Sequence, residues 1–195
     1  MPAAEDALCL FDIFFANVHP YVPVVVKSHF HQQWRKDKES ISPLLLEAIF
    51  ACSGRMSDDP AQGAQWLALA NSELSPSPES DWNLIPEPEQ EEHFLDTPRL
   101  STLQALLLLL KARESVPKRG YYYRSWMTCK TIVTMSKDLD LHEHYSAHTD
   151  GQCCDSDPVE CLTKTRIWQT ILICEMMVGS PQGMYRFEAF ISNNC

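Results

Sequence analysis

The sequence predicts an all-α protein, a multi-helix array of antiparallel helix pairs with one surface loop rich in proline and glutamate. Two observations carry this prediction. Apolar residues recur at helical spacing through most of the chain, and Ser-Pro or Asp-Pro start signals precede several of these runs. The chain has 195 residues, of which 45% are hydrophobic, so it is long enough to bury one sizeable core. We therefore expect a single domain over residues 1–195.

The centre of the predicted array is a helix pair within residues 97–142. The first helix has leucines on one face at i, i+3, i+4 and i+7, namely Leu103, Leu106, Leu107 and Leu110. Leu108 and Leu109 fill its other sides, and a helix that is apolar nearly all round must be buried against several neighbours. Ser101 and Gln104 are predicted to cap its start as a capping box.

The second helix of the pair carries two adjoining apolar stripes, which predict two neighbours. One stripe consists of Tyr122, Trp126, Cys129 and Val133, and the other of Ile132, Met135 and Leu139. Stripes at helical spacing are the ordinary signature of burial. The alternative is a ligand-binding wall built from Tyr121, Tyr122, Tyr123 and Trp126. We favour core packing.

The N-terminal segment is predicted to be a helix over residues 4–18, with the inner face Leu8, Phe11, Phe15 and Val18. Residues 21–30 include a β-branched run. Because Pro20 and Pro23 flank or interrupt this run, a short extended connector is a better prediction than a central strand. Three histidines of this region could in principle bind a metal, but no further ligand has a defined spacing from them, so polar or capping roles are favoured. They are His19, His29 and His31.

Two further helices follow from their start signals. Ser42 and Pro43 begin one that ends at Gly54, with the face Leu45, Ala48, Ile49 and Cys52. Asp59 and Pro60 begin the next, whose small-residue face would allow a close approach to a neighbouring helix. That face consists of Ala61, Ala64, Leu67 and Ala68.

The last helix is predicted to begin at Asp157-Pro158-x-Glu160, a capping-box pattern. Its apolar stripe consists of Ile167, Ile171, Cys174 and Val178. Arg166 on this helix either pairs with a carboxylate of a neighbouring helix or is solvated, and the sequence does not favour one of these roles.

The acidic segment 75–96 is rich in Pro, Ser and Glu and is predicted to be a surface loop. Ser75, Ser77 and Ser80 lie beside acidic residues, and their phosphorylation would make this loop a regulatory insert. A solvated linker without such a role is favoured, because this composition is common in linkers.

Residues 142–158 contain five conceivable zinc ligands, namely His142, His144, His148, Cys153 and Cys154. His144 and His148 have the i, i+4 spacing of a helical ligand pair, but the polar run around Gly151 indicates a loop. The His-Glu-x-x-His order of a hydrolytic zinc site is missing. We therefore interpret residues 143–157 as a polar loop and assign no metal-binding, catalytic or cofactor-binding residue.

Charge and cysteine content limit the classes of function. The formal net charge of −10 argues against direct contact with a phosphate backbone, since nucleic-acid affinity depends largely on Lys and Arg. No apolar run reaches membrane-spanning length and the N-terminus lacks a basic start, so we expect an intracellular protein. The 8 cysteines have no repeated Cys-x-x-Cys spacing. Cys9, Cys52, Cys129 and Cys174 are predicted to be reduced core residues, while Cys153, Cys154 and Cys161 lie in or beside a polar loop.

Enzymatic activity is not expected. The sequence has no GxSxG elbow, GxGxxG turn, phosphate-binding loop or catalytic metal motif.

Several segments resemble the middle regulatory region of fungal transcription factors with a zinc binuclear cluster, of the xylanolytic activator type. The segments are FDIFFANVHPYVPVVVKSHF, LLLEAIFACSGR, TLQALLLLLKARE, SWMTCKTIVTMSKDLDLH and KTRIWQTILICEMMVGSPQG. The chain departs from the family pattern at four places. Asp140 replaces a Gly, Thr134 an Arg and Gln169 a second Trp, and Met184-Tyr185 follows where the family has Arg-Pro. Arg166, Trp168 and Glu175 are the counterparts of the family's Arg, first Trp and acidic residue.

The resemblance implies a nuclear protein that binds DNA and regulates transcription by RNA polymerase II. Zinc is expected only in an N-terminal cluster, which these 195 residues do not contain, so no cofactor is expected in this chain. This part would modulate activation through contacts with a small inducer or with protein partners. The competing hypothesis is a helical protein-interaction scaffold without DNA binding.

The family's region continues with further helices after its Gly-Arg-Pro turn. We therefore expect the chain to be truncated at its C-terminus, with apolar faces that promote self-association or low stability.

Overall fold

A computed structural model describes residues 1–74, 94–114 and 121–179. These residues form eight α-helices, one short 3-10 helix and no strand, which confirms the predicted all-α class. The helices are α1 Ala4–Asn17, α2 Lys27–Lys36, α3 Pro43–Gly54, α4 Pro60–Glu73, α5 Leu100–Glu114, α6 Tyr121–Asp138, α7 Leu141–Thr149 and α8 Pro158–Gly179, with the 3-10 helix η1 at Lys38–Ser40. None of these helices is both long enough and apolar enough to cross a membrane.

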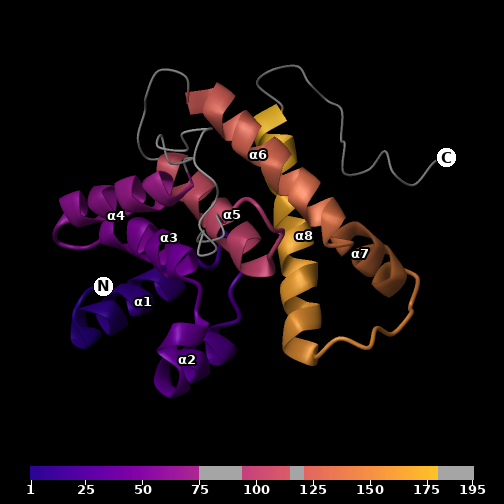
Figure 1. Cartoon of the computed structure of the whole chain (residues 1–195), viewed down its shortest axis with the longest axis horizontal. Helices are drawn as coiled ribbons and strands as arrows, with labels where there is room; N and C mark the ends of the chain where they lie inside the picture. The colour runs from indigo at the N-terminus through magenta and orange to yellow at the C-terminus, as the bar shows by residue number, and fades with distance from the viewer. Residues whose placement is uncertain (75–93, 115–120, 180–195) are drawn as a thin grey trace, which may run out of the picture.

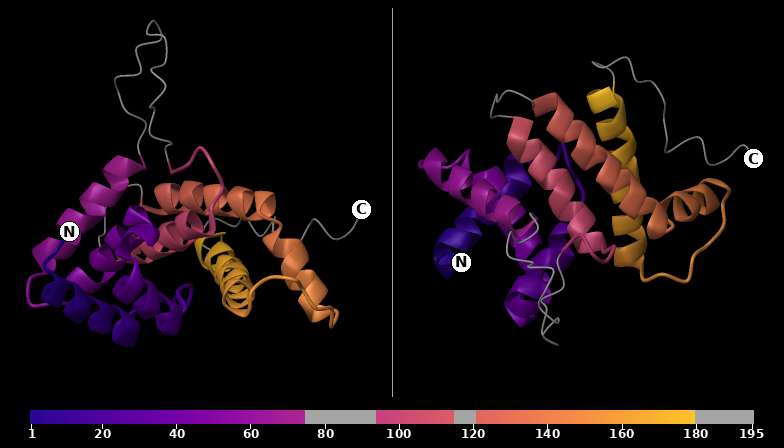
Figure 2. Two further views of the ribbon diagram at one scale, coloured as in Figure 1. Left: turned by 60° about the horizontal axis from the view of Figure 1, so that its bottom comes forward. Right: turned by 45° about the horizontal axis from the view of Figure 1, so that its top comes forward.

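Helix α5 joins two groups of helices (Figures 1 and 2). On one side it packs against α3, which in turn contacts α1 and α4. On the other side it contacts α6 and α8, and α7 packs against α6 and α8. Nine residues of α5 are buried, among them every leucine from Leu106 to Leu110. The prediction of a central helix buried on several sides is therefore confirmed.

The N-terminal helix buries an aromatic face, as predicted, but with a different membership. Phe11, Phe15 and Val18 are buried, whereas Leu8 is 46% exposed. Ala7, Leu10 and Phe14 complete the buried face instead. The buried side of α1 is centred on Phe11 and Phe14, and Leu8 lies outside it.

The connector after α1 is shorter than expected. Helix α2 begins at Lys27, so the last four residues of the predicted extended segment 21–30 are helical. Two aromatic side chains one helical turn apart explain the difference, because Phe30 and Trp34 both pack edge-on against Phe11, with ring centroids 4.9 and 4.8 Å apart. This burial stabilises a short polar helix that has a weak signal of its own.

Helices α3 and α4 begin and pack largely as their start signals predict. The Asp59 carboxylate accepts a hydrogen bond from the Ala61 N–H at 3.1 Å. The predicted small-residue face of α4 is wrong, because Ala61, Ala64 and Ala68 are exposed. Close approach instead uses two glycines. A Cβ atom on Gly63 would lie 2.5 Å from the Arg55 nitrogen, and one on Gly54 would lie 2.8 Å from the Gly63 nitrogen.

The predicted capping boxes do not form. Helix α5 begins at Leu100, so Ser101 lies inside its first turn, and the Gln104 side chain donates a hydrogen bond to the Val24 carbonyl at 2.6 Å. At α8 the Asp157 carboxylate accepts from the Val159 N–H at 2.9 Å, whereas Glu160 pairs with Lys164 at 2.7 Å. The Gln104 side chain is therefore used in a long-range contact, and the Glu160 side chain in an i, i+4 ion pair within α8, instead of in the caps.

Helix α6 buries Cys129, Ile132, Val133 and Met135, which confirms core packing for most of the two stripes. Tyr122 and Tyr123 are 57% and 63% exposed, so Tyr122 is not part of the buried face. The side chain of Tyr121 lies outside the described residues. Tyr122, Tyr123 and Trp126 line neither of the two cavities described below.

The predicted polar loop 143–157 is wrong in its first half, because residues up to Thr149 belong to α7. Asp140 has φ 52° and ψ 30°, a left-handed conformation that ends α6 and turns the chain into α7. Leu141 is fully buried and anchors the new helix. The polar residues that indicated a loop belong to a short helix, most of whose side chains are half-buried.

Two predictions fall largely outside the described residues. They concern the acidic loop 75–96 with its serines, of which only residues 94–96 are described, and the tail after Gly179.

Candidate functional site

A groove lies where α2, the start of α5 and the start of α8 meet. Its volume is about 400 Å³. Its apolar surface is formed by Val25, Phe30, Ile41, Leu45 and Leu100. Polar side chains from the three helices surround this surface, among them His29, Gln33, Gln104, Glu160 and Thr163. An apolar pocket with a few convergent polar groups is the usual form of a site for a small ligand or an apolar peptide side chain.

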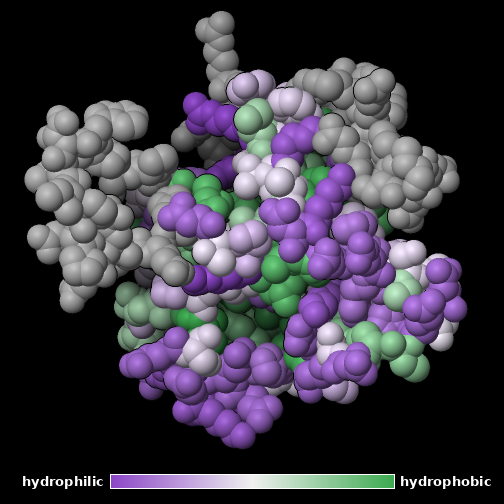
Figure 3. Space-filling model, turned by 45° about the vertical axis from the view of Figure 1, so that its right-hand side comes forward, coloured by the Kyte–Doolittle hydropathy of each residue, from purple (hydrophilic) through white to green (hydrophobic). Residues whose placement is uncertain are grey.

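On the face of the molecule seen in Figure 3, hydrophobic surface lies recessed between hydrophilic side chains. A second cavity, of about 440 Å³, lies beside α1, α3 and α5 and is lined by Val18, Cys52, Arg55, Met56, Lys111, Ala112 and Glu114. Lys111 and Glu114 form an ion pair at 2.6 Å there. The Cys52 thiol donates a hydrogen bond to the Leu108 carbonyl at 3.2 Å, and burial raises its pKa to about 12, so this thiol is unreactive.

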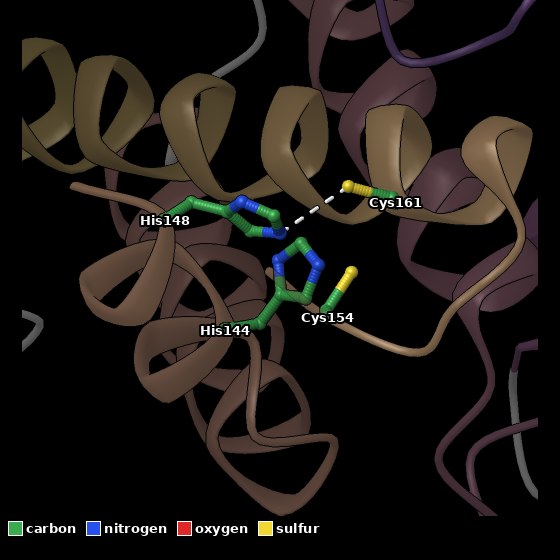
Figure 4. A group of neighbouring side chains, drawn as sticks. All are labelled: His144, His148, Cys154 and Cys161. Atoms are coloured by element: carbon green, nitrogen blue, oxygen red, sulfur yellow. Dashed lines mark hydrogen bonds between the residues drawn. The ribbon is translucent and has the colours of Figure 1, made fainter. Parts of the chain in front are cut away.

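A compact group of histidine and cysteine side chains, residue types that can bind a metal, lies near the N-terminal end of α8 (Figure 4). It consists of His144, His148, Cys154 and Cys161, whose ligand atoms all lie within 4.8 Å of one another. The two histidines are one turn apart on α7, Cys154 comes from the connection after α7, and Cys161 lies in the first turn of α8. We call these four residues the His/Cys cluster.

Three of these four residues, His144, His148 and Cys154, are candidate zinc ligands in the sequence, although the predicted loop assigns them no ligand role. Cys161 is not among these candidates, because the contact between α7 and α8 that brings this residue to the cluster is not visible in the chain order. Two other candidates lie elsewhere. The ring of His142 packs 6.1 Å from that of Trp168, and Cys153 is exposed. The sequence signal for this cluster is the i, i+4 spacing of His144 and His148, which brings the two rings together only if the segment is helical.

The groups of the His/Cys cluster interact with one another. The His148 Nε2 atom lies 3.4 Å from the Cys161 sulfur, and the rings of His144 and His148 are 4.6 Å apart. A hydrogen bond with His148 lowers the pKa of the Cys154 thiol to about 7. Burial lowers the pKa of His144, and the neighbouring His148 adds to this effect. The cluster therefore favours thiolate at Cys154 and neutral imidazole at His144.

The three N-terminal histidines lie in different surroundings. His19 Nε2 lies 2.7 Å from the Val25 carbonyl, which agrees with the expected polar role, and burial lowers the pKa of its ring. The His31 ring packs 5.2 Å from that of Phe15, and His29 lines the groove. Among the cysteines, Cys52 and Cys129 are buried as expected, but Cys9 is exposed.

The family's acidic and basic positions on α8 do not pair with each other in the described part of the chain. Trp168 is buried in the core. Arg166 is half-buried and forms no salt bridge with a described carboxylate, while both oxygens of Glu175 are buried without a hydrogen-bond partner. No active-site arrangement of a nucleophile and a base is formed by these groups.

Comparison with known proteins decides the family. The fungal specific transcription factor domain matches residues 11–179, which include all the helices except the start of α1. This chain belongs to that family. Members of the family and the relatives of this chain are transcription factors, which are not enzymes.

Two relatives are similar over almost the whole domain. This chain is 30% identical over 182 residues to cutinase transcription factor 1 alpha of Fusarium vanettenii. The aligned residues cover 91% of this chain and 18% of that protein. The chain is 25% identical over 205 residues to the C6 finger domain transcription factor hasF of Aspergillus fumigatus, with 93% of this chain and 25% of that protein covered. The domain thus spans a quarter or less of either relative. No solved structure matches the chain.

Proposed function

We propose that this regulatory domain controls the activity of a nuclear zinc-cluster transcription factor through the groove between α2, α5 and α8. In this proposal the full-length protein binds DNA through an N-terminal zinc cluster and regulates transcription by RNA polymerase II. The domain contributes no DNA contact, because its net charge of −10 repels a phosphate backbone.

The observation that supports this role is the family match over residues 11–179 in a fold whose helices leave an open groove. The groove walls come from segments far apart in the sequence, so an occupant would contact both helix groups joined by α5. A ligand that prefers one arrangement of these groups shifts their equilibrium. Transmission of activation then follows from a change in packing around α5.

The occupant is a small apolar inducer or an apolar segment of a partner protein. A helical scaffold without DNA binding would use the same groove for a partner helix. Both relatives are named as transcription factors, and this favours the regulatory role over the scaffold.

The test compares two neighbouring glutamines of α2. Gln33 lines the groove, whereas Gln32 is exposed and does not. The domain is placed between a heterologous DNA-binding domain and an activation domain, and transcription of a reporter is measured in a fungal host. We expect Gln33→Trp, which fills the groove, to change reporter output at least several-fold relative to the unsubstituted domain, while Gln32→Trp leaves it unchanged.

Equal protein levels and equal helical circular dichroism are required for both variants. Identical reporter output for Gln33→Trp, Gln32→Trp and the unsubstituted domain would show that the groove does not control activity.

A further inference from the structure

We propose that His144, His148, Cys154 and Cys161 bind one zinc ion in a tetrahedral site that fastens α7 and residues 150–157 to α8. This site is separate from the N-terminal zinc cluster through which such factors are expected to bind DNA. It would stabilise the regulatory domain itself.

The geometry of the His/Cys cluster is close to that of a structural zinc site. Its ligand atoms lie within 4.8 Å of one another. Zn–S bonds of about 2.3 Å and Zn–N bonds of about 2.0–2.1 Å place the ligand atoms of a tetrahedral site about 3.3–3.8 Å apart. Side-chain rotations that draw the four groups inward by about 1 Å therefore complete the site. Figure 4 shows the side chains directed toward a common point from α7, the loop and α8.

The His144 ring supplies an independent indication of a missing ligand. Both of its nitrogen atoms are buried, and neither has a hydrogen-bond partner in the described parts of the chain. Buried polar atoms are nearly always paired, and an unpaired one carries the full cost of its desolvation. Coordination of a metal by one ring nitrogen removes this cost for that atom.

The donor set favours zinc over other cations. Two thiolates and two neutral imidazoles balance the charge of Zn²⁺, so a half-buried site needs no further counterion. Thiolate and imidazole donors in a tetrahedral arrangement select zinc, whereas Mg²⁺ and Ca²⁺ prefer oxygen ligands. The four protein ligands fill all four positions of a tetrahedral zinc ion and leave none open for water or substrate, which indicates a structural site.

A Cys154–Cys161 disulfide is the competing arrangement of the same cysteines. It would consume both thiols and leave His144 with the same unpaired nitrogens. Zinc accounts for all four residues, and a disulfide accounts for two.

The site would fix a part of the fold that is weak without it. Helix α7 has nine residues, which is short for an independently stable helix. Cys161 lies beside Glu160 and Thr163, two residues of α8 that line the groove. Zinc would therefore also hold one groove wall in place.

The first experiment measures zinc in the full chain, purified under reducing conditions and dialysed against buffer without metal. Mass spectrometry of the metal content should give about one zinc ion per chain. After replacement of zinc by Co²⁺, the absorption spectrum should show the thiolate charge-transfer band and the intense visible bands of a tetrahedral cobalt site. Folded, reduced chain without bound zinc and without these bands would overturn the proposal.

Adjacent residues provide matched controls for the ligands. Cys154→Ser and Cys161→Ser should each lower the zinc content to about zero, whereas Cys153→Ser, beside Cys154 but outside the cluster, should keep it. His144→Asn and His142→Asn form a second pair with the same expectation. Helical circular dichroism shows whether each variant is folded. Equal zinc loss in Cys153→Ser and Cys154→Ser would contradict the assignment, as would full zinc retention in Cys154→Ser/Cys161→Ser.

Discussion

Glu47 lies on α3 with only 6% of its surface exposed. Among the charged groups around it, Glu73 of α4 has the largest effect on its pKa. Burial and the charge of Glu73 raise the pKa of Glu47 from 4.5 to about 7. The protonated carboxyl group can donate a hydrogen bond between the two side chains, which two carboxylates cannot share. The folded chain therefore keeps a proton that the unfolded chain releases at a lower pH.

This difference predicts that the chain becomes less stable as pH rises. Between pH 4.5 and about pH 7 the folded state binds more protons at Glu47 than the unfolded state does, so the free energy of unfolding falls over this window. The loss attributable to Glu47 should be roughly 1–3 kcal/mol. Glu47→Gln should remove this part of the pH dependence, which urea unfolding at both ends of the window measures. Glu39→Gln, at an exposed position, is the control. The same slope in Glu47→Gln as in the unsubstituted chain would contradict this assignment.

Single residues also show why some features could not be predicted. Asp140 replaces the family's glycine and still adopts the left-handed conformation at φ 52°. Asp enters this region less readily than Gly, so the local pattern gave no reason to expect a second helix directly after it. Helix α7 starts here because Leu141 is buried in the core, and this burial is a tertiary contact that the local sequence does not show.

At the scale of helices, a strong apolar periodicity predicts a helix from the sequence, whereas short polar helices lack such a pattern. The leucines of α5 predict a central helix from the sequence, and the structure agrees. Helices α2 and α7 are not predicted from the sequence because both are short and polar, and each depends on packing against its neighbour in the chain, α1 for α2 and α8 for α7. The sequence assigns no ligand role to His144, His148 or Cys154, because the histidine pair depends on α7 being helical and Cys161, the fourth member of the His/Cys cluster, comes from α8.

The contact between α3 and α4 gives a prediction at this scale. A Cβ atom on Gly63 would lie 2.5 Å from the Arg55 nitrogen and 2.8 Å from the Gly54 carbonyl carbon, both of which are backbone atoms that cannot rotate away. Gly63→Ala should therefore separate the helices and lower the free energy of unfolding by about 1–3 kcal/mol, although Ala favours a helix. Ala64→Ser, at the exposed neighbouring position, should change stability by no more than about 0.5 kcal/mol. Thermal or urea unfolding compares the two variants, and a Gly63→Ala chain as stable as the original would refute the close approach.

At the scale of the whole molecule, α5 connects the helices that precede it with those that follow it, and the groove opens where both groups contribute residues. The α8 surface also exposes Ile173 and Met177, at 50% and 62%. Self-association of the chain stays a prediction that these apolar side chains support. The single-domain assignment over residues 1–195 is likewise a prediction. The family could be predicted from the sequence because this chain contains the family's helix patterns. The geometry of the groove could not, because it depends on contacts between helices that are distant in the chain.

The central claim is that this folded domain regulates transcription, and reporter output tests it most directly. The domain is compared with an inert helical spacer of the same length between the same heterologous DNA-binding and activation domains. We predict that the domain changes reporter transcription several-fold relative to the spacer. Equal transcription from both fusions, at equal protein levels, would contradict the regulatory role.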